Sequence, residues 1–206
     1  MTESIRDIGC VVMASGLSAR YGRDKLLERL DGREIACHTV GSLTAAGLVP
    51  LVVTRSEALR ALMEREGVAC ARPDGPLKSD TMRAGLESLP ENAAGFLFMP
   101  ADQPLVRPAS LKRLAERFLR RPARAVMLGF GSDAGSPVIF PAACRSALLA
   151  YRGDRGGKDV LRAQNIPCDI AQAEYEWELW DVDTPEGMER VREVYDSMVK
   201  GSFNRS

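Results

Sequence analysis

Residues 8–25 read IGCVVMASGLSARYGRDK, and this stretch decides the fold. Its opening, Ile8 to Met13, is apolar and predicts a strand. Small, flexible residues follow at once, and such a loop brings backbone N–H groups close to an anion because few Cβ atoms stand in the way. Arg20 and Lys25 then lie where two cations neutralise phosphate charge. The expected occupant is a triphosphate; the alternative is an ordinary strand-to-helix turn with solvated charges.

Two common phosphate-binding motifs do not fit this loop. The P-loop needs two glycines separated by four residues and a lysine followed by serine or threonine. Here Gly16 and Gly22 are separated by five residues, and Leu26 follows Lys25. The dinucleotide-binding pattern G-x-G-x-x-G is also absent, which argues against a dinucleotide-dependent oxidoreductase.

The composition indicates one domain in the cytoplasm. The 206 residues suffice for one sizeable α/β domain, which we expect over residues 1–200, with 201–206 as a disordered tail. The 28 basic and 28 acidic residues cancel, so we expect no nucleic-acid or membrane surface. The start, Met1-Thr2-Glu3-Ser4, does not resemble a signal peptide. Scattered cysteines and a single histidine, His38, argue against disulfides, zinc and histidine-based catalysis.

Short apolar runs alternate with longer amphipathic stretches along the chain. This alternation predicts βαβ units, a mostly parallel sheet with helices on both faces, and a Rossmann-like nucleotidyltransferase fold when combined with the resemblance given below. The expected strands are Ile8–Met13, Val49–Thr54, Gly95–Met99, Ala125–Leu128, Pro137–Phe140 and Cys168–Ile170. The expected helices are Ile35–Ala46, Ser56–Glu66, Thr81–Ser88, Pro108–Arg120, Ala142–Ala150, Lys158–Gln164 and Pro185–Met198.

A second informative segment, Pro100 to Pro104, follows the strand Gly95–Met99. Ligands of parallel sheets collect at the carboxyl ends of the strands, so we expect this segment to meet the glycine-containing loop. Asp102 lies between the two prolines and is well placed to hold Mg²⁺, which prefers one or two carboxylates together with substrate phosphates. The alternative is a turn aspartate that binds its own backbone.

A cluster of carboxylates, Asp181 to Glu186, precedes the last expected helix. Asp181 and Asp183 alternate, so in an extended strand both point the same way and either reaches a metal. A simpler reading is that Asp183 or Thr184 caps the helix that begins at Pro185.

Three further segments are candidates for substrate contacts. Lys78 to Leu86 has the pattern of a capped helix start, which suits a nucleotide. Gly135 to Phe140 is expected to be a loop entering a strand, and Gly153 to Asp159 combines flexible backbone with charges of both signs. Each of the last two segments contacts a polar or anionic second substrate, or is a plain surface turn.

Taken together and in this order, the segments resemble the MobA-like nucleotidyltransferases, especially their molybdenum cofactor cytidylyltransferase (MocA-like) branch. The opening signature L-A-A-G-x-S-x-R-x-G-x-x-K is matched by Met13 to Lys25, and S-L-R-A-G-L by Thr81 to Leu86. The metal motif D-Q-P stands at Asp102 to Pro104. The remaining signatures, G-x-P-x-x-F, G-D-x-G-x-[RK] and D-x-D-T-P-E, stand at Gly135 to Phe140, Gly153 to Lys158 and Asp181 to Glu186.

The resemblance implies Mg²⁺-dependent transfer of a nucleoside monophosphate to the phosphate of molybdopterin, with release of pyrophosphate. It implies CTP rather than GTP as donor, because Ala14-Ser15-Gly16 is closer to the form that accompanies cytidylyl transfer. A product of this kind serves a molybdenum hydroxylase, on which the protein is expected to dock. The residues carried over are, for catalysis, Arg20, Lys25 and Asp102; for the metal, Asp102 and Asp183; for the nucleotide, Ala14, Ser15, Gly16, Arg20, Lys25, Lys78, Thr81 and Gly85; and for the acceptor, Gly135, Ser136, Pro137, Asp154 and Lys158.

The chain departs from the family pattern at three positions. Ser15 replaces the second alanine and Met13 replaces leucine, and a loop that acts through backbone N–H groups tolerates both changes. Ser136 stands where many relatives carry histidine, so the acceptor is less well defined. Two alternatives stay open: the same transfer to a sugar phosphate, methylerythritol phosphate or phospholactate-type acceptor, and a non-catalytic factor that holds a cofactor.

Overall fold

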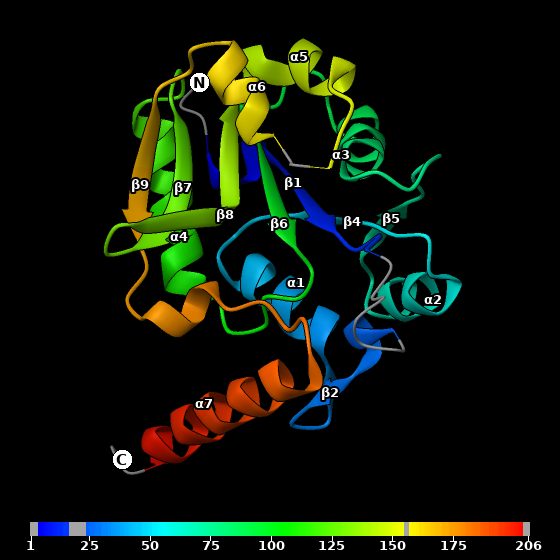
Figure 1. Ribbon diagram of the computed structural model, residues 1–206, viewed down its shortest axis with the longest axis vertical. Coiled ribbons are helices and arrows are strands. Elements are labelled where there is room, and N and C mark those ends of the chain that lie inside the picture. Colours follow the sequence, from blue (N-terminus) through cyan, green and yellow to red (C-terminus); the bar gives the residue numbers. More distant parts are fainter. Residues whose placement is uncertain (1–3, 17–23, 155–156, 204–206) are drawn as a thin grey trace.

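The computed structural model describes residues 4–16, 24–154 and 157–203. Its centre is a seven-stranded sheet with the order β5-β4-β1-β6-β8-β7-β9 (Figure 1). The strand β8 is antiparallel to both β6 and β7, and the other pairs in the sheet are parallel. The prediction of a mostly parallel sheet is therefore confirmed. The strands are β1 (Ile8–Met13), β4 (Pro50–Val53), β5 (Ala69–Ala71), β6 (Gly95–Pro100), β7 (Ala125–Phe130), β8 (Asp133–Pro141) and β9 (Cys168–Gln172).

Helices cover both faces of the sheet. One apolar cluster contains side chains of α1, α2, α4 and α7, and a second cluster contains side chains of α3, α5 and α6. Because both faces are covered, the central strand β1 is an almost uninterrupted apolar run and buries all of its residues except the partly exposed Met13. The helices are α1 (Ile35–Ala45), α2 (Glu57–Arg65), α3 (Lys78–Glu87), α4 (Pro108–Arg120), α5 (Arg145–Ala150), α6 (Lys158–Ala163) and α7 (Pro185–Phe203).

Short elements complete the described part of the chain. A small hairpin joins β2 (Arg29–Leu30) to β3 (Arg33–Glu34) through Asp31 and Gly32, which both have positive φ angles, as such a tight turn requires. The 3-10 helices are η1 (Ile5–Asp7), η2 (Lys25–Leu27), η3 (Ala142–Cys144) and η4 (Glu176–Leu179). None of the helices in the described ranges combines the length and the apolar character that crossing a membrane requires.

The structure differs from the sequence-based prediction at several boundaries. The edge strand β5 and the β2–β3 hairpin were not predicted, because each is too short to carry a periodic pattern. Helix α3 begins three residues earlier than expected, at Lys78, and β8 begins four residues earlier, at Asp133. Helix α7 reaches Phe203, so residues 201–203 of the expected tail are helical, while 204–206 lie outside the described residues.

Candidate active site

A cavity of about 490 Å³ opens at the carboxyl ends of β1 and β6. These strands pair in parallel with Met13 opposite Pro100, and the Ala101 N–H donates to the Met13 carbonyl at 3.1 Å. The loops that follow them therefore leave the sheet side by side, as the sequence predicts. The cavity is lined by Met13, Ala14, Ser15, Gly16, Lys25, Leu26, Pro76, Lys78, Thr81, Met82, Phe98, Pro100, Asp102, Ser136, Val138, Phe140, Gly157, Lys158, Asp181 and Asp183.

The Lys25 ammonium joins two carboxylates from distant parts of the chain. Its Nζ lies 2.5 Å from Asp102 Oδ2 and 2.8 Å from Asp183 Oδ1. The side chains of Lys25 and Asp102 are only 12% and 15% exposed, so solvent screens this pair weakly. Burial, the largest single cause, lowers the pKa of Lys25, but the combined effect of Asp102 and Asp183 outweighs it and raises the pKa. Lys25 therefore stays charged at neutral pH.

The backbone ties the two acidic segments together. The Val182 N–H donates to the Asp102 carbonyl at 2.9 Å, which brings Asp181 and Asp183 beside the segment after β6. Asp181 lines the cavity, and part of its surface is exposed to solvent there. Burial, followed by the charges of Asp102 and Asp183, raises the pKa of Asp181 to about 6, although Gln103 and Lys25 oppose the shift.

Asp102 has the properties of a metal ligand. Its Oδ1 is buried and has no hydrogen-bond partner, while Oδ2 binds Lys25. A buried carboxylate oxygen without a partner is costly unless it meets a cation. Asp102 and Asp183 supply the oxygen ligands that Mg²⁺ prefers. Within residues 4–16, 24–154 and 157–203, however, no three His, Cys, Asp or Glu side chains are already gathered around a common metal position.

The loop after β1 is held on two sides. The Ala14 N–H donates to the Val53 carbonyl at 2.9 Å, and the hydroxyl of Ser15 bonds that of Thr81 in α3. Ala14, Ser15 and Gly16 all line the cavity, as does Thr81. The structure thus brings these predicted nucleotide-binding residues together beside Lys25. Arg20, the second predicted cation, lies outside the described residues.

The first N–H groups of helix α3 are bound by the chain itself. The Lys78 N–H donates to Asp154 Oδ1 at 2.9 Å, and the Ser79 N–H donates to the Gly153 carbonyl at 3.1 Å. Asp154, a predicted acceptor-binding residue, is thus a cap of α3 in the structure and does not line the cavity. These two N–H groups are therefore not available to a nucleotide. The side chains of Lys78 and Thr81 line the cavity, so any contact of this helix start with a nucleotide would come from them.

Three other predicted residues stand outside the cavity lining. Gly85 packs α3 against β1, because a Cβ atom there would lie 2.7 Å from both Val11 methyl groups. Gly135 and Pro137 belong to β8 and do not line the cavity, whereas their neighbours Ser136 and Val138 do. Lys158 lines the cavity, and its Nζ donates to the Ala134 carbonyl at 3.3 Å.

One wall of the cavity is apolar, and its residues were not predicted as site residues. It consists of Met82, Phe98, Val138 and Phe140, with the Phe98 and Phe140 rings meeting edge to face at 5.6 Å. Gly157 allows the chain to pass over this wall, because a Cβ atom there would lie 2.4 Å from the Phe140 ring. The strand pattern marks the two phenylalanines only as core.

A family model for the MobA-like NTP transferase domain matches residues 10–168 of this chain. The protein belongs to this family. Every part of the cavity described above comes from the matched residues except Asp181 and Asp183, which follow them. The expectation of a MobA-like nucleotidyltransferase is confirmed at this level.

The family assignment agrees with individual relatives. Over 112 residues the chain is 29% identical to the bifunctional protein GlmU of Rubrobacter xylanophilus, a match that covers 52% of this chain and 24% of that protein. The chain therefore spans about a quarter of that relative's length. The crystal structure of Rv0371c from Mycobacterium tuberculosis H37Rv is similar, with a TM-score of 0.77 and 25% identity over 90% of this chain and 98% of the other. A complex of Rv0371c with manganese has a TM-score of 0.72 and 23% identity, over 89% of this chain and 96% of the other.

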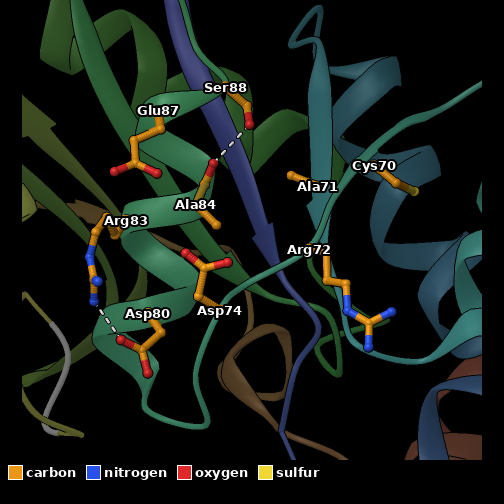
Figure 2. A pocket seen from close by; sticks show the side chains of 9 residues that line it. All are labelled: Cys70, Ala71, Arg72, Asp74, Asp80, Arg83, Ala84, Glu87 and Ser88. Atoms are coloured by element: carbon orange, nitrogen blue, oxygen red, sulfur yellow. Dashed lines mark hydrogen bonds and ion pairs between the residues drawn. The ribbon is translucent and has the colours of Figure 1, made fainter.

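The MobA-like domain has a second hollow on another face of α3, with a volume of about 360 Å³ (Figure 2). Its walls carry charges of both signs, and these are partly neutralised by ion pairs of Arg83 with Asp80 and of Arg72 with Glu57. No residue predicted for the site lines it. Its described lining is Cys70, Ala71, Arg72, Asp74, Asp80, Arg83, Ala84, Glu87 and Ser88.

Proposed function

We propose that this MobA-like protein transfers CMP from CTP to the phosphate of molybdopterin and releases pyrophosphate. The observation that carries the proposal is the Lys25 ammonium between Asp102 and Asp183, beside the Ala14–Gly16 loop in one cavity. Cationic and carboxylate groups that lie beside a phosphate-binding loop suit a metal-assisted transfer between phosphates. A protein that only stores a nucleotide has no need of this arrangement.

In the proposed reaction, an oxygen of the acceptor phosphate forms a bond to the α-phosphorus of CTP. The bond from that phosphorus to the bridging oxygen of the β-phosphate breaks, and its electron pair leaves with pyrophosphate. The attacking phosphate is already anionic at neutral pH, so the protein needs no general base. Its residues instead align the two phosphates and neutralise their charge.

Each residue then has a defined task. The N–H groups of Ser15 and Gly16 bind phosphate oxygens, since that of Ala14 is bonded to Val53, while Lys25 and, by resemblance, Arg20 offset the charge that develops on the leaving pyrophosphate. Asp102, with its unpartnered Oδ1, and Asp183 would hold Mg²⁺. When bound, Mg²⁺ neutralises charge on phosphate oxygens. The charged Lys25 keeps the two carboxylates from repelling each other before substrates bind.

The apolar wall supports an acceptor with a ring system. Met82, Phe98, Val138 and Phe140 line the cavity but are each at most 7% exposed, so they form an apolar backing for a pterin rather than a broad open surface, and Lys158 and Ser136 offer polar contacts. A sugar phosphate has little apolar surface to bury there. In this proposal the dinucleotide product is passed in the cytoplasm to a molybdenum hydroxylase on which the protein docks.

The test is pyrophosphate release with Mg²⁺ and each of CTP, GTP, ATP and UTP, with and without molybdopterin. We expect release that requires molybdopterin, prefers CTP and disappears in Asp102→Ala. Release with another phosphorylated acceptor instead refutes molybdopterin but keeps the transfer. No release with any acceptor, together with cofactor binding that Asp102→Ala leaves unchanged, points to a non-catalytic carrier.

A further inference from the structure

The carbonyl of Ser15 is held by a residue outside the cavity wall. Arg55 follows β4 and Thr54, and its Nη2 donates to the Ser15 carbonyl oxygen at 2.7 Å. Ser15 and Gly16 line the cavity, whereas Arg55 does not. The Ser15 carbonyl is therefore directed away from the cavity, toward the connection between β4 and α2.

This bond also fixes the direction of the next N–H group. The Ser15–Gly16 peptide is trans, so its carbonyl and its N–H lie in one plane and point in opposite directions. With the carbonyl directed at Arg55, the Gly16 N–H points the opposite way, and Gly16 itself lines the cavity. Among the described residues, this N–H meets no backbone acceptor. A peptide turned the other way would present carbonyl oxygen to a phosphate and repel it.

The other anchors of the loop do not set this peptide plane. The Ala14 N–H is bound to Val53, which fixes the peptide before Ala14. The hydroxyl contact between Ser15 and Thr81 fixes a side chain. Glycine at position 16 leaves the backbone free to rotate, so the orientation needs a group that binds the carbonyl itself. Arg55 is that group.

We propose that Arg55 is a positioning residue, which orients the Ser15–Gly16 peptide so that the Gly16 N–H binds a phosphate of the nucleotide. Arg55 acts through Ser15 and does not touch the substrate. The identity of the ligand as a nucleoside triphosphate rests on the proposed function. The geometric part of the inference needs only a polyphosphate, for which pyrophosphate is a direct probe.

The experiment compares Arg55→Ala and Arg55→Lys with wild type. The control is Arg60→Gln, because Arg60 is a nearby arginine of α2 that pairs on the surface with Glu57 and Glu64. Calorimetry gives the affinities for CTP, CMP and pyrophosphate. We expect Arg55→Ala to weaken pyrophosphate and CTP by on the order of 10-fold or more, since one preorganised donor is misaligned. Arg55→Lys, which also donates to a carbonyl, should recover part of the loss, and Arg60→Gln should match wild type.

The amide of Gly16 provides a second measurement. In protein labelled with ¹⁵N-glycine, pyrophosphate should shift the Gly16 amide signal of wild type and leave it unmoved in Arg55→Ala at equal thermal stability. A merely structural Arg55 would lower the melting temperature and leave both the pyrophosphate affinity and this signal unchanged, which overturns the inference. If Arg55→Ala does not fold, Arg55→Lys and the wild-type amide shift still decide it.

The outcomes separate this inference from the proposed function. Wild type that binds pyrophosphate through Gly16 but neither CTP nor GTP contradicts the proposed function and keeps Arg55 as a positioning residue. Wild type and Arg55→Ala that bind CTP and pyrophosphate equally well contradict the inference alone. Wild type that binds none of these probes overturns both.

Discussion

Replacing Asp181 by asparagine should stabilise the protein, and only above mildly acidic pH. The pKa of this carboxyl is raised from 3.8 to about 6, first by burial and then by the charges of Asp102 and Asp183. Between these two pH values the folded state binds more protons at Asp181 than the unfolded state does. Its contribution to the free energy of unfolding therefore falls as the pH rises from about 4, and stops falling above about 6.

The size of the effect follows from the shift and from the exposure of the side chain. Raising the pKa from 3.8 to about 6 corresponds to about 3 kcal/mol for a group shielded from solvent. Asp181 has an exposed surface, so screening by solvent reduces the value to about 1 kcal/mol. Asp181→Asn removes the charge and keeps the shape. It should gain about 1 kcal/mol at pH 8 and close to nothing at pH 4.

Urea unfolding in the presence of EDTA measures this difference without interference from metal ions. Wild type and Asp181→Asn are compared at intervals from pH 4 to pH 8. The control is Asp74→Asn, which changes an exposed aspartate of the second hollow. The reasoning is refuted if Asp181→Asn destabilises the protein at pH 8, or if its advantage is the same at both ends of the range.

Three further predictions concern the site and its support. Lys25→Met should lower kcat/KM for pyrophosphate release by roughly 10²–10³-fold, and Lys25→Arg by less; equal rates in wild type and Lys25→Met would contradict the role of the ammonium. Asp102→Asn should abolish the binding of Mn²⁺ in the presence of CTP, measured by electron paramagnetic resonance, and unchanged binding excludes Asp102 as a ligand. Gly85→Ala should cost about 1–3 kcal/mol in urea unfolding, because the new methyl group meets buried Val11. Gly187→Ala in α7 is the matched control, since its Cβ atom meets nothing closer than 3.5 Å, and an equal effect of both changes would refute the packing argument.

Secondary structure was predicted best for buried elements that have a clear pattern of apolar residues in the sequence. The strand Ile8–Met13 and the helix Pro108–Arg120 are found with the predicted bounds. The strand is an apolar run that ends at small residues, and the helix is amphipathic with a proline at its start. Edge strand β5 is a three-residue Ala-Cys-Ala segment with no residue fully buried, so it has no such pattern. Its place in the sheet depends on pairing with β4.

The site residues could be predicted where they follow strands that are neighbours in the sheet. Lys25 and Asp102 follow strands that are neighbours in the sheet, and the structure brings them into contact. The capping of α3 by Asp154 was hidden, because it joins residues 76 positions apart. Phe98 and Phe140 were hidden for another reason: a strand pattern shows that a side chain is buried, but not whether it faces a helix or a cavity.

The hydrogen bond between Val182 and Asp102 has a consequence for the order in which the protein matures. It joins residues far apart in the chain, and a contact of this sequence separation forms late because the intervening chain must first be ordered. On the ribosome, Asp102 emerges long before its partners at 181–183. The loop after β1 and the strands beside it can therefore assemble while the cavity still lacks Asp181 and Asp183. With Asp183 in its proposed role, turnover requires residues 181–183 to be in place as well as the sheet, so activity would report the joining of these segments and not formation of the sheet alone.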